Sequence, residues 1–170
     1  KKKSFEHIKQ MINSGAEIID IGGESTRPGS KTIKEKIEWK RVENVVKKFK
    51  KTFNKTCLSL DTRKSDLMIR GIKHGVDLIN DVSGFKYNAN SLRKIKKYKI
   101  GKVLHHMQGT PNTMQINPKY QNVLLDIYDF FEKNINKFDT HKIIIDPGIG
   151  FGKTLKHNLT LISKISLFHS

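Results

Sequence analysis

Three polar side chains stand at the ends of apolar runs, where such groups can bind a polar ring. Asp61 ends "CLSLD", Asn80 follows "VDLI" and Asp146 ends "KIIID". Carboxylate and amide oxygens accept hydrogen bonds, so together they suit a ring edge that presents several N–H donors. Each residue alone is more often a helix N-cap or a turn residue, and Asp61 before "TRKS" suits such a cap. Three of them, each at the end of a predicted strand, favour a ligand site.

The stretch "IIDIGGESTRPGS", residues 18–30, runs from an apolar segment into glycines, hydroxyls and an arginine. A strand that only fills a core needs no such ending. Arginine binds phosphate through two parallel hydrogen bonds, and a threonine hydroxyl adds a donor. We expect Gly22 and Gly23 to let the backbone turn sharply, with Thr26 and Arg27 facing an anion. The alternative is an ordinary surface loop.

Two further motifs have weaker chemical meaning. "DPGIGFGKT" differs from a P-loop because Pro147 stands at its first glycine position, so its clustered glycines indicate a close backbone approach or a tight turn. His105 and His106 are adjacent, and adjacent strand residues point to opposite faces. We therefore expect one histidine at the strand-end rim and the other against helices, not a metal site made by the pair.

The elements that must position these residues alternate between helix and strand. Apolar residues at helical spacing give way, through Gly15, Gly75 and Gly101, to short apolar runs. A glycine after the last helical turn is typical of a left-handed C-cap, and such runs are typical of strands buried on both faces. The predicted strands are 17–22, 56–61, 77–82, 102–106 and 142–146, and the predicted helices are 5–14, 34–53, 65–74, 89–99, 119–137 and 157–167. This alternation predicts a parallel sheet with right-handed crossovers.

An open doubly wound sheet and a (β/α)8 barrel both fit this order. In an open sheet the chemistry gathers at one switch point, whereas a barrel brings every carboxyl strand end to a common rim. All five predicted strands end in polar groups, which favours the barrel. A complete barrel takes about 250 residues. We therefore expect an α/β fold, an incomplete TIM barrel of about five strands and six helices, with residues 1–170 as a single domain truncated at both ends.

The composition limits which cellular compartment and which classes of partner fit this chain. The net charge is +17, but lysines are spread over every predicted helix without interleaved aromatic residues, so solvated helix faces are favoured over a nucleic-acid surface. Cys57 is the single cysteine, which excludes an internal disulfide and fits a reducing compartment. No apolar stretch approaches the length of a membrane span, and the basic start lacks the apolar segment of a signal peptide. We expect a cytoplasmic protein that binds neither membranes nor nucleic acid.

The motifs "IIDIGGESTRPGS", "SLDTRKS", "LINDVSG", "HHMQGTPNTMQ" and "IIIDPGIGFGKTLKHN" occur in the order and spacing of the dihydropteroate synthase family, which the whole chain resembles. The resemblance implies a TIM-barrel transferase of folate biosynthesis. Such an enzyme joins 6-hydroxymethyl-7,8-dihydropterin diphosphate to para-aminobenzoate, giving 7,8-dihydropteroate and diphosphate, and sulfonamides block this step. By the resemblance, the pterin is bound by Asp61, Asn80, Asp146 and Met107, and the diphosphate and aminobenzoate by Thr26, Arg27 and Phe151, with Arg27 also catalytic.

The resemblance also implies Mg²⁺ and a homodimer. The family's magnesium-associated asparagine belongs to a first-strand loop that this sequence does not contain, so we expect no metal ligand in these residues. The later lysine, arginine and histidine motifs are absent too, and we expect residues 1–170 alone not to turn over substrate. Two alternatives stay open: another pterin-binding barrel, such as a methyltetrahydrofolate methyltransferase, against which "ESTRPG" argues, and a noncatalytic basic nucleic-acid-binding paralogue.

Overall fold

The computed structural model describes residues 2–27, 29–138 and 142–169. Helices and strands alternate in the order α1 (Lys2–Asn13), β1 (Ile18–Gly22), α2 (Glu35–Thr52), β2 (Cys57–Asp61), α3 (Ser65–Lys73), β3 (Leu78–Asp81), α4 (Ser91–Ile95), β4 (Gly101–His105), α5 (Val123–Ile135), β5 (Ile143–Asp146) and α6 (Leu155–Ser163), with a final 3-10 turn, η2 (Ile165–Phe168). The strands form one parallel sheet in the order β1-β2-β3-β4-β5. This is the arrangement of an incomplete α/β barrel.

The strand predictions are confirmed, each within one residue of the observed ends, but four helix predictions need correction. The helix predicted over 5–14 begins at Lys2, and the helix predicted over 119–137 is α5, Val123–Ile135, with Asn122 as its N-cap residue. The helix predicted over 89–99 is only α4, Ser91–Ile95. The helix predicted over 157–167 begins at Leu155 and ends at Ser163. The Thr154 hydroxyl and the His157 side chain each bind the other's backbone N–H, and this capping box fixes the earlier start.

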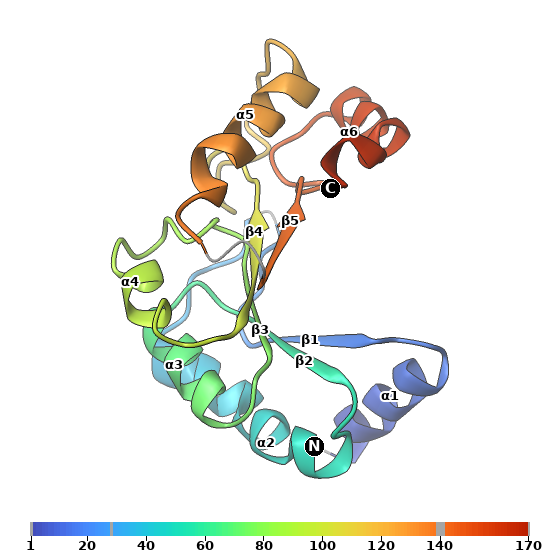
Figure 1. Cartoon of the computed structure of the whole chain (residues 1–170), viewed down its shortest axis with the longest axis vertical. Helices are drawn as coiled ribbons and strands as arrows, with labels where there is room; N and C mark the ends of the chain where they lie inside the picture. Colours follow the sequence, from blue (N-terminus) through green and yellow to red (C-terminus); the bar gives the residue numbers. More distant parts are fainter. Residues whose placement is uncertain (1, 28, 139–141, 170) are drawn as a thin grey trace.

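One face of the sheet packs on the helices. Ile19, Leu58, Ile79 and Leu104 are at most 2% exposed, and they contact apolar residues of the surrounding helices. Figure 1 shows the strand direction turning from β1 to β5, with α1 and α2 near β1 and β2, α3 next to α4, and α5 and α6 beside β4 and β5. Because side chains alternate along a strand, the residues between these core positions belong to the opposite, concave face.

The concave face is partly open, so the expectation of strands buried on both faces is wrong at its edges. Ile18 in β1 is 45% exposed and Ile144 in β5 is 46% exposed. The helices cover only the other face of these two outer strands, which leaves the alternate side chains accessible. The concave face also carries the polar residues at the strand ends.

Burial along α2 departs from the apolar pattern of its sequence at Ile37. That side chain is 47% exposed, whereas Glu38 and Trp39 are buried. Glu38 can be buried because it accepts hydrogen bonds from Thr62 and Lys64. Ionic pairing therefore overrides apolar periodicity at this position.

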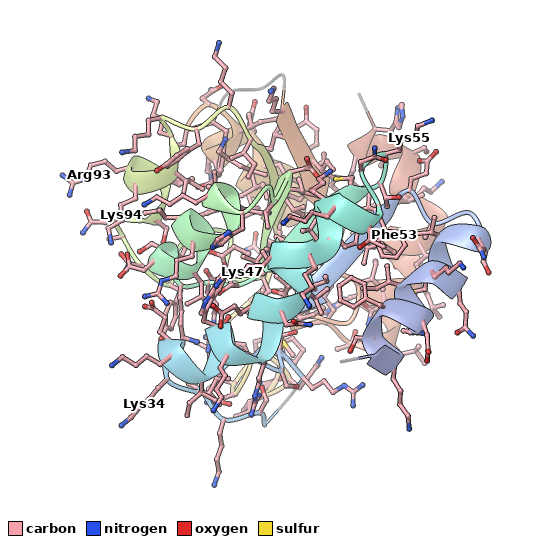
Figure 2. The ribbon with its side chains drawn as sticks, turned by 90° about the horizontal axis from the view of Figure 1, so that it is seen from below. Lys34, Lys47, Phe53, Lys55, Arg93 and Lys94 are labelled. Atoms are coloured by element: carbon pink, nitrogen blue, oxygen red, sulfur yellow. The ribbon has the colours of Figure 1, made fainter. Side chains whose placement is uncertain are left out.

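Basic residues lie on the outside of the helices. Figure 2 shows Lys34, Lys55 and Arg93 pointing away from the fold at separate places, while Phe53 points toward α1. Phe53 stacks on Phe5 with ring centroids 6.2 Å apart. In the described parts of the chain, no helix combines the length and apolar character needed to cross a membrane.

Candidate active site

The register of the sheet places the predicted ring-binding residues on one face. Asp61 is paired with Asn80, and Asn80 with Val103. His105 and Asp146 are paired with each other, and His105 lies two residues beyond Val103. Because residues two apart share a face, Asp61, Asn80 and Asp146 all belong to the concave face at the carboxyl ends of their strands.

Asp61 is the last residue of β2 and is not a helix cap. Helix α3 begins only at Ser65, with Lys64 as its N-cap residue. Burial, followed by the negative charges of Asp20 and Asp81, raises the pKa of Asp61 to about 7. A carboxyl group with this pKa can hold or release a proton near neutral pH.

Asn80 is held by Asp20, a residue of strand β1. Its Nδ2 donates to Oδ2 of Asp20 in β1 at 3.1 Å. Its Oδ1 is buried and has no hydrogen-bond partner among the described residues. The NH2 group of the amide is therefore hydrogen-bonded, whereas its oxygen has no partner among the described residues.

Asp146 is bound at both carboxylate oxygens. Oδ2 lies 3.0 Å from Nδ1 of His105, and Oδ1 accepts from the backbone N–H of Gly148 at 2.8 Å. Burial acts to raise the pKa of Asp146, but the His105 and Gly148 hydrogen bonds outweigh it and lower the pKa overall. The carboxylate thus stays charged, with 41% of its side chain exposed.

The two histidines separate as predicted. His105 contacts the ring of Phe151 edge to face at 4.6 Å, beside Asp146 on the concave face. His106 packs against the ring of Phe130 at 4.9 Å, on the helix side. Burial and the charge of Lys153 lower the pKa of His106 to about 3, so this imidazole is neutral.

The "DPGIGFGK" turn is pressed against the end of β4. A Cβ atom at Gly148 would lie 2.0 Å from the carbonyl oxygen of His106, and the φ angle there is +70°. Lys153, 3% exposed, donates to the carbonyl of Phe151 at 2.9 Å. Burial lowers the pKa of Lys153 to about 8. The turn therefore has a fixed path that holds Phe151 beside His105.

Thr26 and Arg27 lie in the loop between β1 and α2. Arg27 is exposed, Thr26 is half-buried, and the Arg27 backbone N–H donates to Ser25 Oγ at 3.4 Å. The chain bends at Gly23 and Glu24, so the sharp turn predicted for these glycines is confirmed, and neither Gly22 nor Gly23 has a positive φ angle. A Cβ atom at Gly23 would lie 2.6 Å from the carbonyl oxygen of Glu38, so this glycine lets the loop pass close to α2.

Met107 is half-buried two residues after the end of β4. The structure thus brings Asp61, Asn80, Asp146 and Phe151 to the concave face or its rim, while the Arg27 side chain is exposed on its own loop. Within the described part of the chain, no group of three or more His, Cys, Asp or Glu side chains is arranged to hold a metal ion.

The sequence motifs do not indicate Asp20 or the pairing of His105 with Asp146. Side-chain alternation along β1 indicates that Asp20 lies on the same face as Asp61, because Asp20 precedes Gly22 by two residues and Gly22 is paired with Asp61. By the same alternation, Asp81, next to Asn80, points to the helix side. There it is fully buried and accepts hydrogen bonds from Ser83.

Comparison with known proteins decides the family. A family model described as "Pterin binding enzyme" matches residues 1–170. The chain belongs to this family. It is 37% identical over 171 residues to the dihydropteroate synthase of Escherichia coli strain K12, an alignment covering 98% of this chain and 60% of that protein.

Solved structures of pterin binding enzymes agree with the fold. The crystal structure of Yersinia pestis dihydropteroate synthase with a sulfonamide drug complex matches with a TM-score of 0.94 and 36% identity, covering 99% of this chain and 62% of that one. Xanthomonas albilineans dihydropteroate synthase with 4-aminobenzoic acid matches with a TM-score of 0.87 and 28% identity, covering 98% of this chain and 60% of that one. The chain thus spans about three fifths of the length of these relatives.

Proposed function

We propose that the protein carrying this chain is a dihydropteroate synthase, which joins 6-hydroxymethyl-7,8-dihydropterin diphosphate to para-aminobenzoate. The observation that carries the proposal is the set of polar side chains on the concave face: the carboxyls of Asp61 and Asp146 and the amide of Asn80. The similarity to dihydropteroate synthases over 98% of the chain supports the same function.

In this proposal the pterin ring binds across the strand ends. A pterin presents a 2-amino group and an adjacent ring N–H, and one charged carboxylate can accept both. Asp146 suits this role because its pKa is lowered and its orientation is fixed by His105 and Gly148. Asp61 and Asn80 meet other polar atoms of the ring, and Met107 packs against it.

The proposed reaction is dissociative. The bond between the pterin methylene carbon and the diphosphate oxygen breaks, and its electron pair leaves with diphosphate. The amine nitrogen of aminobenzoate then bonds to the methylene carbon and releases a proton. Arg27, with Thr26, stabilises the leaving diphosphate and helps form the aminobenzoate site beside Phe151. No strongly basic side chain is needed for this path.

We also propose that Mg²⁺ accompanies the diphosphate and offsets its charge. The described residues do not themselves fit a resident metal site, because they offer no cluster of three ligating side chains. The steps assigned to this chain therefore concern ring binding and the arginine loop.

The proposed setting is a cytoplasmic homodimer that binds small molecules and no nucleic acid and is inhibited by sulfonamides. Support for the compartment comes from the single cysteine, Cys57, and support for the absence of nucleic acid from the scattered placement of Lys34, Lys55 and Arg93. A sulfonamide complex of a 36% identical enzyme supports the inhibition.

The experiment is an assay of the complete protein with the dihydropterin diphosphate, aminobenzoate and Mg²⁺. We expect dihydropteroate and diphosphate in equal amounts, and inhibition by a sulfonamide that aminobenzoate relieves. Methyl transfer from methyltetrahydrofolate in place of dihydropteroate formation would contradict the proposal.

A further inference from the structure

The loop between β1 and α2 is fastened at both ends by one carboxylate. Glu24, at the start of the loop, accepts through Oε1 from the backbone N–H of Ile33 at 2.8 Å, near the end of the loop. The same oxygen accepts from Nζ of Lys64 at 3.0 Å. The segment that carries Thr26 and Arg27 is therefore closed on itself and tied to the residues after β2.

Arg63 adds a second connection. Its Nε donates to Oε2 of Glu24 at 3.0 Å, and its Nη2 lies 2.9 Å from the same oxygen. Nη2 also donates to the hydroxyl of Thr32 at 3.1 Å, beside Ile33. The Arg63 guanidinium lies 4.4 Å above the ring of Tyr87, which holds its plane in place.

The contacts are sheltered from water, so they are not the weak ion pairs of an open surface. The Glu24 side chain is 4% exposed, that of Lys64 9% and that of Arg63 11%. Burial acts to raise the pKa of Glu24, but the Ile33, Arg63 and Lys64 contacts outweigh it and lower the pKa overall. Removing one partner of such a group leaves a buried charge without compensation.

Glu38 provides an internal comparison. It shares Lys64 with Glu24 and its side chain is 1% exposed, but its other partner is the hydroxyl of Thr62. It contacts the same ionic cluster without holding Ile33 or Thr32. Substitution of Glu38 therefore tests the stability of the ionic cluster, whereas substitution of Glu24 also removes the contacts that hold the two ends of the loop.

We propose that Glu24 is a positioning residue that holds together the two ends of the loop, at Glu24 and at Thr32 and Ile33, and so sets where Thr26 and Arg27 meet the aminobenzoate and diphosphate. This inference rests on the proposed function for the part that concerns substrates. The fastening of the loop does not depend on it.

The first test measures hydrogen exchange at the Ile33 amide in the complete protein. Glu24→Gln leaves one acceptor oxygen in place of two and turns an NH2 toward the cationic side chains, so Ile33 should exchange about tenfold faster than in wild type. Glu38→Gln should leave that exchange unchanged while lowering the melting temperature. Equal exchange in the two variants would overturn the inference.

The second test measures kinetics. Glu24→Gln should raise KM for aminobenzoate by about tenfold, the effect of one lost charge-assisted contact, with pterin affinity unchanged. Glu38→Gln should leave both values unchanged. Faster Ile33 exchange with an unaltered KM would overturn the substrate part, leaving Glu24 as a structural anchor only. A wild-type protein without turnover would instead contradict the proposed function, and the exchange result would still decide the fastening.

Thr32→Val is a milder variant that tests the same loop contacts if Glu24→Gln does not fold. Thr32→Val removes only the bond from Arg63 Nη2 to an exposed hydroxyl. It should accelerate Ile33 exchange and raise KM for aminobenzoate, both by less than tenfold. No change in either value would contradict the proposal.

Discussion

Asn80 Nδ2 lies 3.1 Å from Oδ2 of Asp20, although the two residues are 60 positions apart and on strands separated by β2. An ionised carboxylate can only accept hydrogen bonds, so the group of Asn80 that faces Asp20 is its NH2. The oxygen of the amide is buried and has no hydrogen-bond partner among the described residues.

This relationship predicts a rescue between the two positions. Asp20→Ala should lower pterin affinity about tenfold, because the Asn80 amide loses the contact that orients it. The double exchange Asp20→Asn with Asn80→Asp should recover most of that affinity, since a donor at position 20 again meets an acceptor at position 80. Calorimetric titration with a pterin measures both. A double variant as weak as Asp20→Ala would show that the amide donates to the ring.

Asp146→Asn should weaken pterin binding by about 2–4 kcal/mol, from the lost charge-assisted contact and the N–H groups left unpaired. The replacement still offers one oxygen to the Gly148 N–H, so the turn should be preserved, and the melting temperature should fall only slightly, because the carboxylate contact with His105 is lost. Calorimetry and thermal melting check the two parts, with Asp129→Asn on the exposed side of α5 as the control. A large fall in melting temperature with normal affinity would make Asp146 a structural turn residue.

Arg27→Ala should lower turnover by about 100-fold, the scale for one transition-state charge contact, and leave pterin affinity unchanged. The guanidinium is exposed, so no loss of stability is expected. Steady-state kinetics with Lys31→Ala, another exposed basic residue of the same loop, supplies the control. Normal turnover of the Arg27 variant would remove it from the reaction.

Asp61 should make stability depend on pH. Its pKa is about 7 in the folded protein and about 3.9 when unfolded, so between these values the folded state holds a proton that the unfolded state releases. Stability contributed by this group is therefore present at low pH and is lost as pH rises from about 4 to about 7. Asp61→Asn should remove that loss, so melting curves of the variant and of wild type should diverge as pH rises. Parallel profiles would contradict the raised pKa.

Gly148→Ala should lower the free energy of unfolding by about 3 kcal/mol or more, because its Cβ would meet the His106 carbonyl at 2.0 Å. Gly150→Ala is the matched control, since its φ angle is +84° but nothing lies within 4 Å of the added Cβ. That variant should cost only about 1–2 kcal/mol of backbone strain. Chemical denaturation measures both, and equal losses would refute the close approach.

The sequence by itself determined the alternation of helices and strands and the position of every strand. Apolar runs such as "KIIID" carry this information locally, because a short run bounded by glycine or a polar turn suits a buried strand. It also determined that Asp61, Asn80 and Asp146 lie at strand ends, and the motifs around them pointed to the family. Because side chains alternate along a strand, the sheet register then places all three on one face.

Tertiary structure alone decided which polar groups meet. Glu38 is buried on α2, against the apolar pattern, because Lys64 from another element neutralises it. The contacts of Glu24 with Ile33, and of Asp20 with Asn80, join residues that no local pattern relates. Hydrogen bonds and ion pairs require particular distances between particular atoms, and folding sets those distances only when strands and loops far apart in the sequence come together.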